Sequence, residues 1–300
     1  MNITSLRRIR PAPLVYLKQI GFTMQKILVT TDFSDASKSG LHFAIQLATQ
    51  MEVELVFFHR FEAMIPSTIH REQIDYALQE QGKAQLNALE NFVDKVYKSM
   101  QSVPATYRCV VLESLYTESS IEGYAQENEF QFICMSTQGA GVLRKIIGTH
   151  TGRVLQRSSV PVLVVPHTYH VQPIKEILYS SDFENFDPEM ATVSTFAVAL
   201  KAKIELAHFY HPGETPLDQN TLTRMWGMKY PQLIQIHLEQ HDLDQGFTAQ
   251  LDQLAKKTQP SIVVFFAHAK KTWFEKWFGS SNSESISYVT RVPMLVYRKI

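Results

Sequence analysis

Several kinds of residue and segment are scarce in this chain of 300 residues. It has only two cysteines, Cys109 and Cys134, which form neither a metal-binding pair nor a disulfide framework. No apolar stretch approaches the roughly 20 residues that span a bilayer. The 12 glycines and 13 prolines exclude a collagen-like or linker-like chain. We therefore expect a globular, cytoplasmic protein with no membrane partner.

The chain also has no excess of charge of either sign. Its 29 basic residues balance 29 acidic ones, so the formal net charge is zero. Nucleic-acid-binding proteins usually carry a basic excess or a basic stripe, and neither occurs here. With 45% hydrophobic residues the chain can bury large cores, and it exceeds the length of roughly 250 residues that one core usually supports. The composition predicts two domains and no nucleic-acid partner.

The first 23 residues hold several basic residues and no acidic one. A signal peptide would continue with an uninterrupted apolar run, which Pro11, Pro13 and Lys18 break here. We interpret residues 1–23 as a loose extension that need not be ordered. The alternative is an upstream start codon, with Met24 as the working one.

A phrase near the N-terminus recurs halfway along the chain. KILVTTDFSD at 26–35 and EILYSSDFEN at 176–185 both read as an apolar strand, two hydroxyl residues and Asp-Phe. Apolar residues at helical spacing follow both copies, and a second apolar strand comes next. The repeat predicts two copies of one domain, at 24–168 and 173–300, joined by a short linker.

Within each copy, apolar strands alternate with helical stretches of ten or more residues. Such alternation implies right-handed crossovers and a parallel sheet that is covered by helices on both faces. The nearly continuous apolar character of strands such as FQFICM at 130–135 and PVLVV at 161–165 agrees. The predicted fold class is α/β, with two tandem doubly wound domains.

Two features of the first copy fall where such sheets bind ligands, beyond the carboxyl ends of the strands. Thr31 and Asp32 follow the first strand, and a glycine-rich loop from Ser136 to Gly152 follows the fourth. Glycines let the backbone approach a phosphate, and N–H groups at a helix start suit an anion. The Asp32 carboxylate is suited to accept hydrogen bonds from a ribose hydroxyl or an adenine amine. Together the two features predict a mononucleotide site.

The loop differs from the common phosphate-binding motifs. It is not a dinucleotide fingerprint, because Arg144 stands at the last glycine position and the loop follows the fourth strand rather than the first. It is not a P-loop, because it contains no Gly-Lys-Ser/Thr.

These motifs resemble those of the universal stress protein family. The resemblance is carried by the strand followed by Thr-Asp-Phe-Ser, by the second strand ending in His59, and by the glycine-rich loop before VPVLVV. It covers both halves of the chain, 24–166 and 174–299. The resemblance implies a five-stranded parallel sheet of order 3-2-1-4-5 in each half, and pairing of the two halves through their last strands. A further homodimer of the whole chain remains open.

The resemblance also implies the residues of the site. Asp32 matches the family's ribose- or adenine-binding aspartate, and Arg60 matches the residue whose backbone meets adenine. The phosphate loop is matched by Met135, Gly139, Gly148, Thr149 and Thr151, and the predicted site also includes Thr31, Ser136 and His150. The implied ligand is ATP or another adenine nucleotide, with a divalent cation on its phosphates.

The first half departs from the family's ATP motif at two points. Ser136 stands at the first glycine position, where a requirement for positive φ would strain it, and eight residues instead of nine separate Gly139 from Gly148. In the second half, Ala267 and Lys270 stand at the first two glycine positions. We predict one nucleotide site in the first half, acting as a regulatory site, and a degenerate one in the second.

Other functions remain open. The departures favour a scaffold of the same fold that binds a protein partner and no nucleotide. A slow ATPase is a third candidate, but no nucleophile with an identifiable base is evident, so we expect no catalytic residue. The 11 histidines join no cysteine or carboxylate at metal-binding spacing, so no metal site is predicted. His59 and His208, at the ends of equivalent strands, are expected to hold those strand ends by hydrogen bonds.

Overall fold

The computed structural model of the chain describes residues 2–5, 25–66, 70–104, 106–137, 150–215, 217–242, 244–267 and 291–299. The first half contains β1 (Asn2–Ser5), β2 (Gln25–Thr30), β3 (Val53–Phe61), β4 (Tyr107–Glu113), β5 (Phe132–Thr137) and β6 (Val162–Pro166), with helices α1 (Lys38–Ala48), α2 (Arg71–Met100), α3 (Thr117–Glu127) and α5 (His150–Arg157). The second half contains β7 (Glu176–Ser180), β8 (Lys203–Tyr210), β9 (Leu233–Gln240), β10 (Ile262–Ala267) and β11 (Met294–Arg298), with helices α6 (Phe186–Leu200), α7 (Gln219–Lys229) and α8 (Phe247–Thr258).

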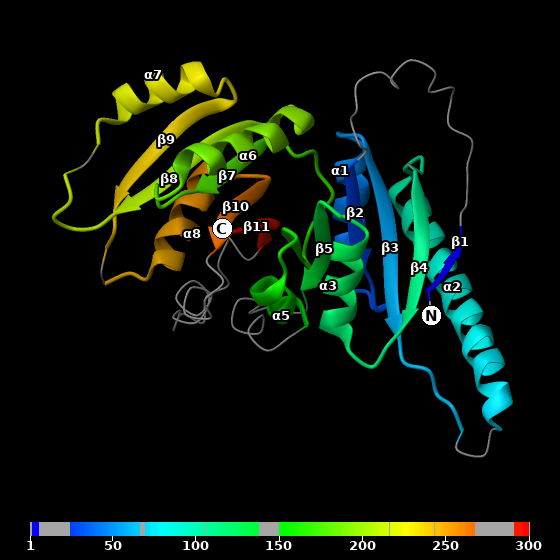
Figure 1. The fold of residues 1–300 in the computed structure, drawn as a ribbon. Helices are drawn as coiled ribbons and strands as arrows, with labels where there is room; N and C mark the ends of the chain where they lie inside the picture. Colours follow the sequence, from blue (N-terminus) through cyan, green and yellow to red (C-terminus); the bar gives the residue numbers. More distant parts are fainter. Residues whose placement is uncertain are drawn as a thin grey trace.

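The described strands form one eleven-stranded sheet in the order β1-β4-β3-β2-β5-β6-β11-β10-β7-β8-β9 (Figure 1). From β4 to β6 and from β9 to β11 every neighbouring pair is parallel. Counting the parallel strands of each half in chain order, and leaving aside the antiparallel β1, the third strand is outermost, followed by the second, first, fourth and fifth. The predicted fold class and the strand order 3-2-1-4-5 are confirmed in both halves.

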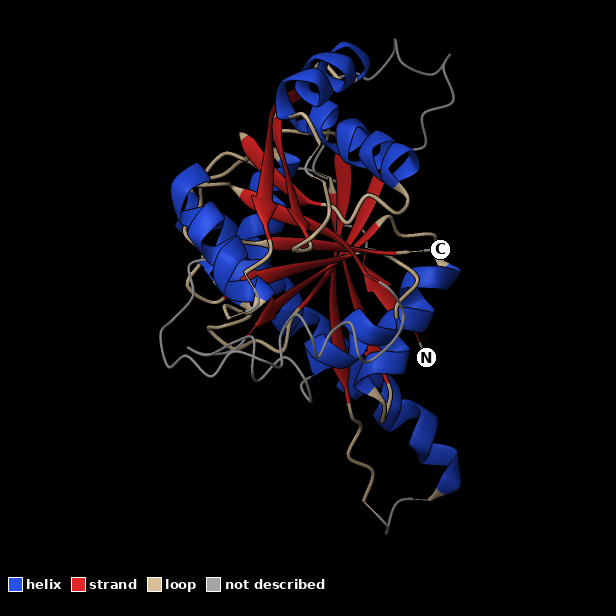
Figure 2. Ribbon diagram, turned by 90° about the vertical axis from the view of Figure 1, so that its left-hand side faces the viewer, coloured by secondary structure: helices blue, strands red, loops and turns tan. Residues whose placement is uncertain are grey.

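Helices cover the sheet on both faces, which explains why its strands are apolar throughout (Figure 2). Val29 and Leu28, neighbours on β2, belong to opposite faces, and both side chains are fully buried. Val29 belongs to the core under α1, α2, α6 and α7, whereas Leu28 belongs to the core under α3, α5 and α8. None of the helices in the described residues, including the 30-residue α2, is both long and apolar enough to cross a membrane.

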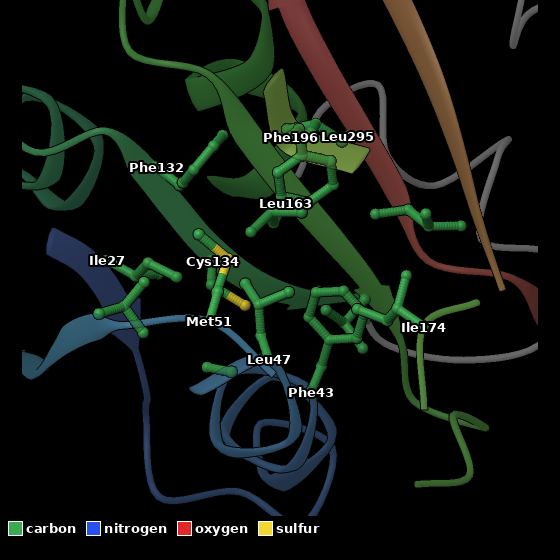
Figure 3. Packing of buried hydrophobic residues seen from close by; sticks show 14 of the residues in the cluster. Ile27, Phe43, Leu47, Met51, Phe132, Cys134, Leu163, Ile174, Phe196 and Leu295 are labelled. Carbon is green, nitrogen blue, oxygen red and sulfur yellow. The ribbon is translucent and has the colours of Figure 1, made fainter. Parts of the chain in front are cut away.

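The two halves meet along β6 and β11, which run antiparallel with Leu163 opposite Leu295. Both leucines are fully buried. On β5, the ring of Phe132 lies 5.7 Å from that of Phe196 on α6 and 6.4 Å from that of Tyr297 on β11. Figure 3 shows side chains of both halves in this shared core. The expected pairing through the last strands is thus present within one chain.

The connection between the halves is packed against the first half. Tyr169 and Ile174 are buried, and the Tyr169 ring lies edge-on to Phe43 of α1 at 5.4 Å. The Gln50 side chain accepts a hydrogen bond from the Ile174 N–H at 2.7 Å and donates one to its carbonyl at 2.9 Å. These contacts fix where the first strand of the second half begins.

The N-terminal extension contributes to the sheet, contrary to the expectation of a loose segment. Residues 2–5 form β1, which pairs antiparallel with β4, with Asn2 opposite Leu112. The physical reason is that β4 would otherwise be an edge strand with unpaired backbone groups, and β1 supplies their partners. Residues 6–24 lie outside the described residues.

Candidate functional site

A sharp turn follows β2 at the carboxyl edge of the sheet. Phe33 has φ 65°, a left-handed conformation that costs a residue with a side chain about 1 kcal/mol or more. Its N–H donates to the Thr31 hydroxyl at 3.1 Å, and the N–H and hydroxyl of Ser34 donate to Asp32 Oδ1 at 3.0 and 2.6 Å. These hydrogen bonds hold the Asp32 carboxylate at this edge, where its side chain is exposed.

The environment of Asp32 favours its charged form. Partial burial raises the pKa of this carboxyl, but the hydrogen bonds from Ser34 outweigh burial and hold the pKa below its ordinary value. Asp32 is therefore a carboxylate at neutral pH, and its oxygens accept hydrogen bonds. A ligand hydroxyl or amine is a matching donor.

His59 supports the turn from the neighbouring strand β3. Its Nδ1 lies 2.8 Å from the Thr31 carbonyl oxygen, and its ring lies 4.1 Å from that of Phe33. Burial lowers the pKa of His59, so the neutral imidazole donates its Nδ1–H to the carbonyl. The predicted role of His59 in holding a strand end is confirmed.

The second half repeats the same turn. Phe183 also has φ 65°, and its N–H donates to the Ser181 hydroxyl at 3.1 Å. The N–H of Glu184 donates to Asp182 Oδ1 at 3.1 Å. His208 Nδ1 lies 2.9 Å from the Ser181 carbonyl oxygen. The His208 ring stacks on the Phe183 ring, with 3.9 Å between their centres. His208 thus has the same role as its counterpart, as predicted.

Ser136, at the first glycine position of the family motif, contacts the first turn of α1. Its hydroxyl accepts a hydrogen bond from the Gly40 N–H at 2.7 Å and donates one to the Ser37 carbonyl at 3.0 Å. A Cβ on Gly40 would lie only 2.7 Å from this hydroxyl oxygen. Ser136 is not among the described residues with positive φ. The position therefore accepts serine without backbone strain.

Hydrogen bonds link three of the predicted residues into an inner group. The Thr31 hydroxyl lies 2.7 Å from the hydroxyl of Ser37, whose carbonyl accepts from Ser136. The Thr151 hydroxyl, at the start of α5, donates to the Ser136 carbonyl at 3.2 Å. Met135 precedes Ser136, but its side chain is buried in the core under α3 and α5. Only the backbone of Met135 is left to meet a ligand.

Two other predicted residues contact the start of α3 instead. The Arg60 guanidinium donates to the Ser114 carbonyl at 3.1 Å and to the Thr117 hydroxyl at 2.7 Å. His150 Nδ1 lies 2.8 Å from Glu118 Oε1. The start of α3 therefore contacts both β3, through Arg60, and α5, through His150.

Glu118 and Arg153 join Arg60 and His150 in an outer group at the start of α3. The sequence analysis missed Glu118 and Arg153. Arg153 Nη1 lies 2.9 Å from the same Glu118 oxygen that contacts His150. Burial raises the pKa of Glu118, but its own backbone N–H, His150 and Arg153 together hold it at about 2. No motif contains these residues, because the pairing depends on how α3 packs against α5. The only available signal was opposite charge at the two helix starts.

The rest of the predicted site is not described. Gly139, Gly148 and Thr149 lie outside the described residues, as does the loop between Thr137 and His150. No group of three or more metal-ligating side chains occurs in the part of the chain that the structure describes.

In the second half, a lysine occupies the corresponding edge. The Lys299 ammonium contacts Asp182 and lies 3.3 Å from Glu184 and 3.7 Å from Glu189, and only 2% of its side chain is exposed. Tyr179 donates its hydroxyl to Glu189 at 2.6 Å. Burial lowers the pKa of Lys299, but the carboxylates outweigh burial and hold the pKa above its ordinary value. The counterpart of Asp32 thus already has an internal partner.

The strand pairing also corrects the alignment of the second loop. The first strands of the two halves repeat at an offset of 150 residues, and by their pairing with β5 and β10 the counterpart of Ser136 is Phe266 rather than Ala267. The Phe266 ring lies 4.8 Å from that of Tyr297 and 5.8 Å from that of Tyr179. An aromatic ring therefore replaces the hydroxyl that binds α1 in the first half. Lys270 lies outside the described residues.

Comparison with known proteins identifies relatives of both the sequence and the fold. Residues 23–166 match the model of the Universal stress protein family. A universal stress protein of Methanocaldococcus jannaschii is 27% identical over 146 residues, covering 47% of this chain and 81% of that protein. Universal stress protein YxiE of Bacillus subtilis is 28% identical over 153 residues, covering 47% of this chain and 97% of that protein. The crystal structure of a universal stress protein from Archaeoglobus fulgidus shares the fold, with a TM-score of 0.60, 13% identity, and coverage of 91% of this chain and 96% of that one.

Proposed function

Since the chain is a two-domain member of the universal stress protein family, we propose that its first half binds an adenine nucleotide as a regulatory ligand. The observation that carries the proposal is the Asp32 turn. Its carboxylate is exposed, is ionised at neutral pH and is held by Ser34 at the carboxyl edge of β2. Doubly wound sheets bind ligands at this edge.

The neighbouring residues indicate which end of the nucleotide lies near Asp32 and which end lies near α5. Asp32 accepts from a ribose hydroxyl or the adenine amine, and the start of α5, with Thr151 and His150, faces the phosphates. The Thr151 hydroxyl is already bound to the Ser136 carbonyl, and His150 is bound to Glu118. The ligand is ATP or another adenine nucleotide, with a divalent cation on its phosphates. Binding of the nucleotide changes the surface at this edge of the sheet, and a protein partner in the cytoplasm recognises the changed surface. This regulation requires no chemical step.

A scaffold that binds no nucleotide is the second candidate. It is favoured by two apolar side chains near the same edge, Leu115 and Tyr116, which are 64% and 70% exposed and immediately precede α3. Exposed apolar residues of this kind suit a protein partner. Slow hydrolysis of ATP is the third candidate, and turnover that disappears in Asp32→Asn would support it.

Calorimetric titration of ATP, ADP and AMP separates these candidates. The protein is first stripped of nucleotide, and any nucleotide released by heating is identified by mass spectrometry. We expect about one ATP per chain. Asp32→Asn removes a charged acceptor worth about 1.5–3 kcal/mol, so affinity should fall roughly 10- to 150-fold. The matched control is Asp182→Asn, the same change in the other half, which should leave affinity unchanged. No heat at millimolar nucleotide, or equal affinity in Asp32→Asn, would favour the scaffold.

A further inference from the structure

The residue that follows the last strand occupies the same place in both halves. Leu163 on β6 lies opposite Leu295 on β11, and their neighbours pair symmetrically, so a pseudo-twofold axis passes between these leucines. The parallel pairing agrees, because Thr137 lies opposite Pro166 and Ala267 lies opposite Arg298. By both criteria, His167 is the counterpart of Lys299.

From this correspondence we propose that the residue at this position decides whether the aspartate turn of its half can take a ligand. Lys299 closes the turn of the second half as an internal cation, whereas His167 leaves Asp32 of the first half open. The inference rests on the proposed nucleotide site and adds the residue that determines where on the chain that site exists.

The closure in the second half is built from several contacts. The Lys299 N–H donates to the Ala267 carbonyl at 2.8 Å, which fixes the backbone beside β10. The side chain then reaches the turn and contacts both Asp182 and Glu184, which belong to the turn itself. Glu189, from α6, completes the set and is 5% exposed. Lys299 and Glu189 are buried, whereas Asp182 and Glu184 keep 46% and 60% of their side chains exposed. Moving the ammonium away would leave the buried Glu189 without its cation, which is unfavourable.

A nucleotide would have to compete with this ammonium. The ribose or adenine donors need the same Asp182 carboxylate that Lys299 contacts. Because the lysine belongs to the chain, it is present at very high effective concentration, and an external ligand with only neutral donors does not displace it. The second half is therefore closed by this contact, in addition to the loss of its glycines.

The first half keeps the aspartate of the turn but lacks the lysine and the second carboxylate of the turn. His167 has a shorter side chain, and the described residues offer its Nδ1 no hydrogen-bond partner. Ser34 stands where the second half has Glu184, and its hydroxyl donates to Asp32 rather than binding a cation. Both aspartates are exposed at the edge of the sheet, so the two halves differ in whether the carboxylate already contacts an internal cation.

Transplanting the closure into the first half tests the proposal. The double variant Ser34→Glu/His167→Lys places the lysine and the second carboxylate of the turn beside Asp32. The matched control is Ser34→Glu/His167→Gln, which carries the same change at 34 and no cation. We expect the lysine variant to bind ATP at least 10-fold more weakly than the glutamine variant. Equal affinity in the two variants would overturn the proposal.

A second readout does not depend on nucleotide. Amine-reactive acylation followed by mass spectrometry measures how accessible each lysine is, with the exposed Lys201 as the internal reference. Lys299 should react at least 10-fold more slowly than Lys201, and the lysine introduced at 167 should be similarly protected. If Lys299 or the lysine introduced at 167 reacts as fast as Lys201, the proposal that a lysine at this position closes the aspartate turn is wrong. If the parent chain binds no nucleotide while both lysines are protected, the proposed function fails but the closure stands.

Discussion

At the scale of single residues, Ser136 and Gly40 fit together because the hydroxyl of one fills the space that a side chain on the other would need. A Cβ on Gly40 would lie 2.7 Å from Ser136 Oγ and 3.4 Å from its backbone nitrogen. A contact of 2.7 Å has to be relieved, either by rotating the Ser136 hydroxyl away from its hydrogen bonds or by shifting the helix from the strand. The departure from the family motif at Ser136 is thus accommodated by a glycine almost a hundred residues away.

Gly40→Ala should therefore lower the free energy of unfolding by about 1–2 kcal/mol, because overpacking outweighs the better helix propensity of alanine. Adding Ser136→Gly should restore most of this loss, since it removes the clashing hydroxyl. Gly123→Ala is the control: a Cβ added there would meet no atom outside the neighbouring backbone of α3 within 4 Å, so stability should rise by up to about 1 kcal/mol. Urea unfolding measures all three. A stabilising Gly40→Ala would show that the pair is not tightly packed.

Glu118 gives the outer group of the site a dependence on pH. Its pKa is about 2 in the folded chain and 4.5 ordinarily, so its contribution to stability is fully present above about pH 4.5 and is lost as the pH falls toward 2. Glu118→Gln should cost about 1–2 kcal/mol at pH 6, and progressively less below pH 4.5. Urea unfolding between pH 3 and 6 tests this. Glu127→Gln, at the exposed far end of α3, is the control, and an equal pH profile for both variants would contradict the assignment.

At the scale of elements, several helices of this chain end in a left-handed residue that is not glycine. Lys201 after α6 has φ 55°, and Gln259 after α8 has φ 51°. Glycine takes up this conformation without a steric penalty. By contrast, α1 ends at Thr49 with φ −79°, which suits any residue.

Lys201→Gly should accordingly raise the free energy of unfolding by about 0.5–1 kcal/mol, because it relieves the left-handed strain at an exposed position. Thr49→Gly is the matched control at the end of α1. It should lower stability by a similar amount, since the backbone there needs no left-handed residue and glycine adds entropy to the unfolded chain. The midpoint of urea unfolding, compared between each variant and the parent chain, measures both changes in stability. A loss of stability in Lys201→Gly would show that its side chain matters more than its backbone.

At the scale of the whole molecule, the two halves share one sheet and two cores, each of which continues from one half into the other. Leu163, Leu295, Phe132 and Phe196 belong to the same cluster and come from both halves. Because the cores are shared, unfolding of one half would expose buried apolar residues of the other half. Neither half is therefore expected to stay folded alone. We expect a single cooperative transition for the chain.

The tryptophans make this expectation measurable, because all three, at 226, 273 and 277, lie in the second half. Phe57→Ala removes a fully buried ring in β3 of the first half, far from the β6–β11 junction. It should cost about 3–5 kcal/mol and lower the unfolding midpoint reported by tryptophan fluorescence. Phe132→Ala, at the junction, should lower the same midpoint. An unchanged fluorescence midpoint in Phe57→Ala would mean that the halves unfold separately.

Much of the fold was predictable from the sequence alone. The repeat of Asp32 and Phe33 at Asp182 and Phe183, and the alternation of apolar strands with helices, are short-range patterns that each local segment carries by itself. The roles of His59 and His208 followed from the same repeat. The family resemblance added the strand order and the pairing of the halves. The central strands are buried on both faces, so nearly all of their side chains are apolar and the strands are easy to recognise in the sequence.

Other features were decided only by the tertiary structure. Lys299 meets Asp182 across 117 residues of sequence, and His150 meets Glu118 across 32, with no local pattern to connect them. The one-residue error that equated Ser136 with Ala267 has the same origin, since only strand register assigns Phe266 to that place. The sequence determined which elements form, because periodicity and turn residues act locally. The structure determined which charges meet, because that depends on how the finished elements pack.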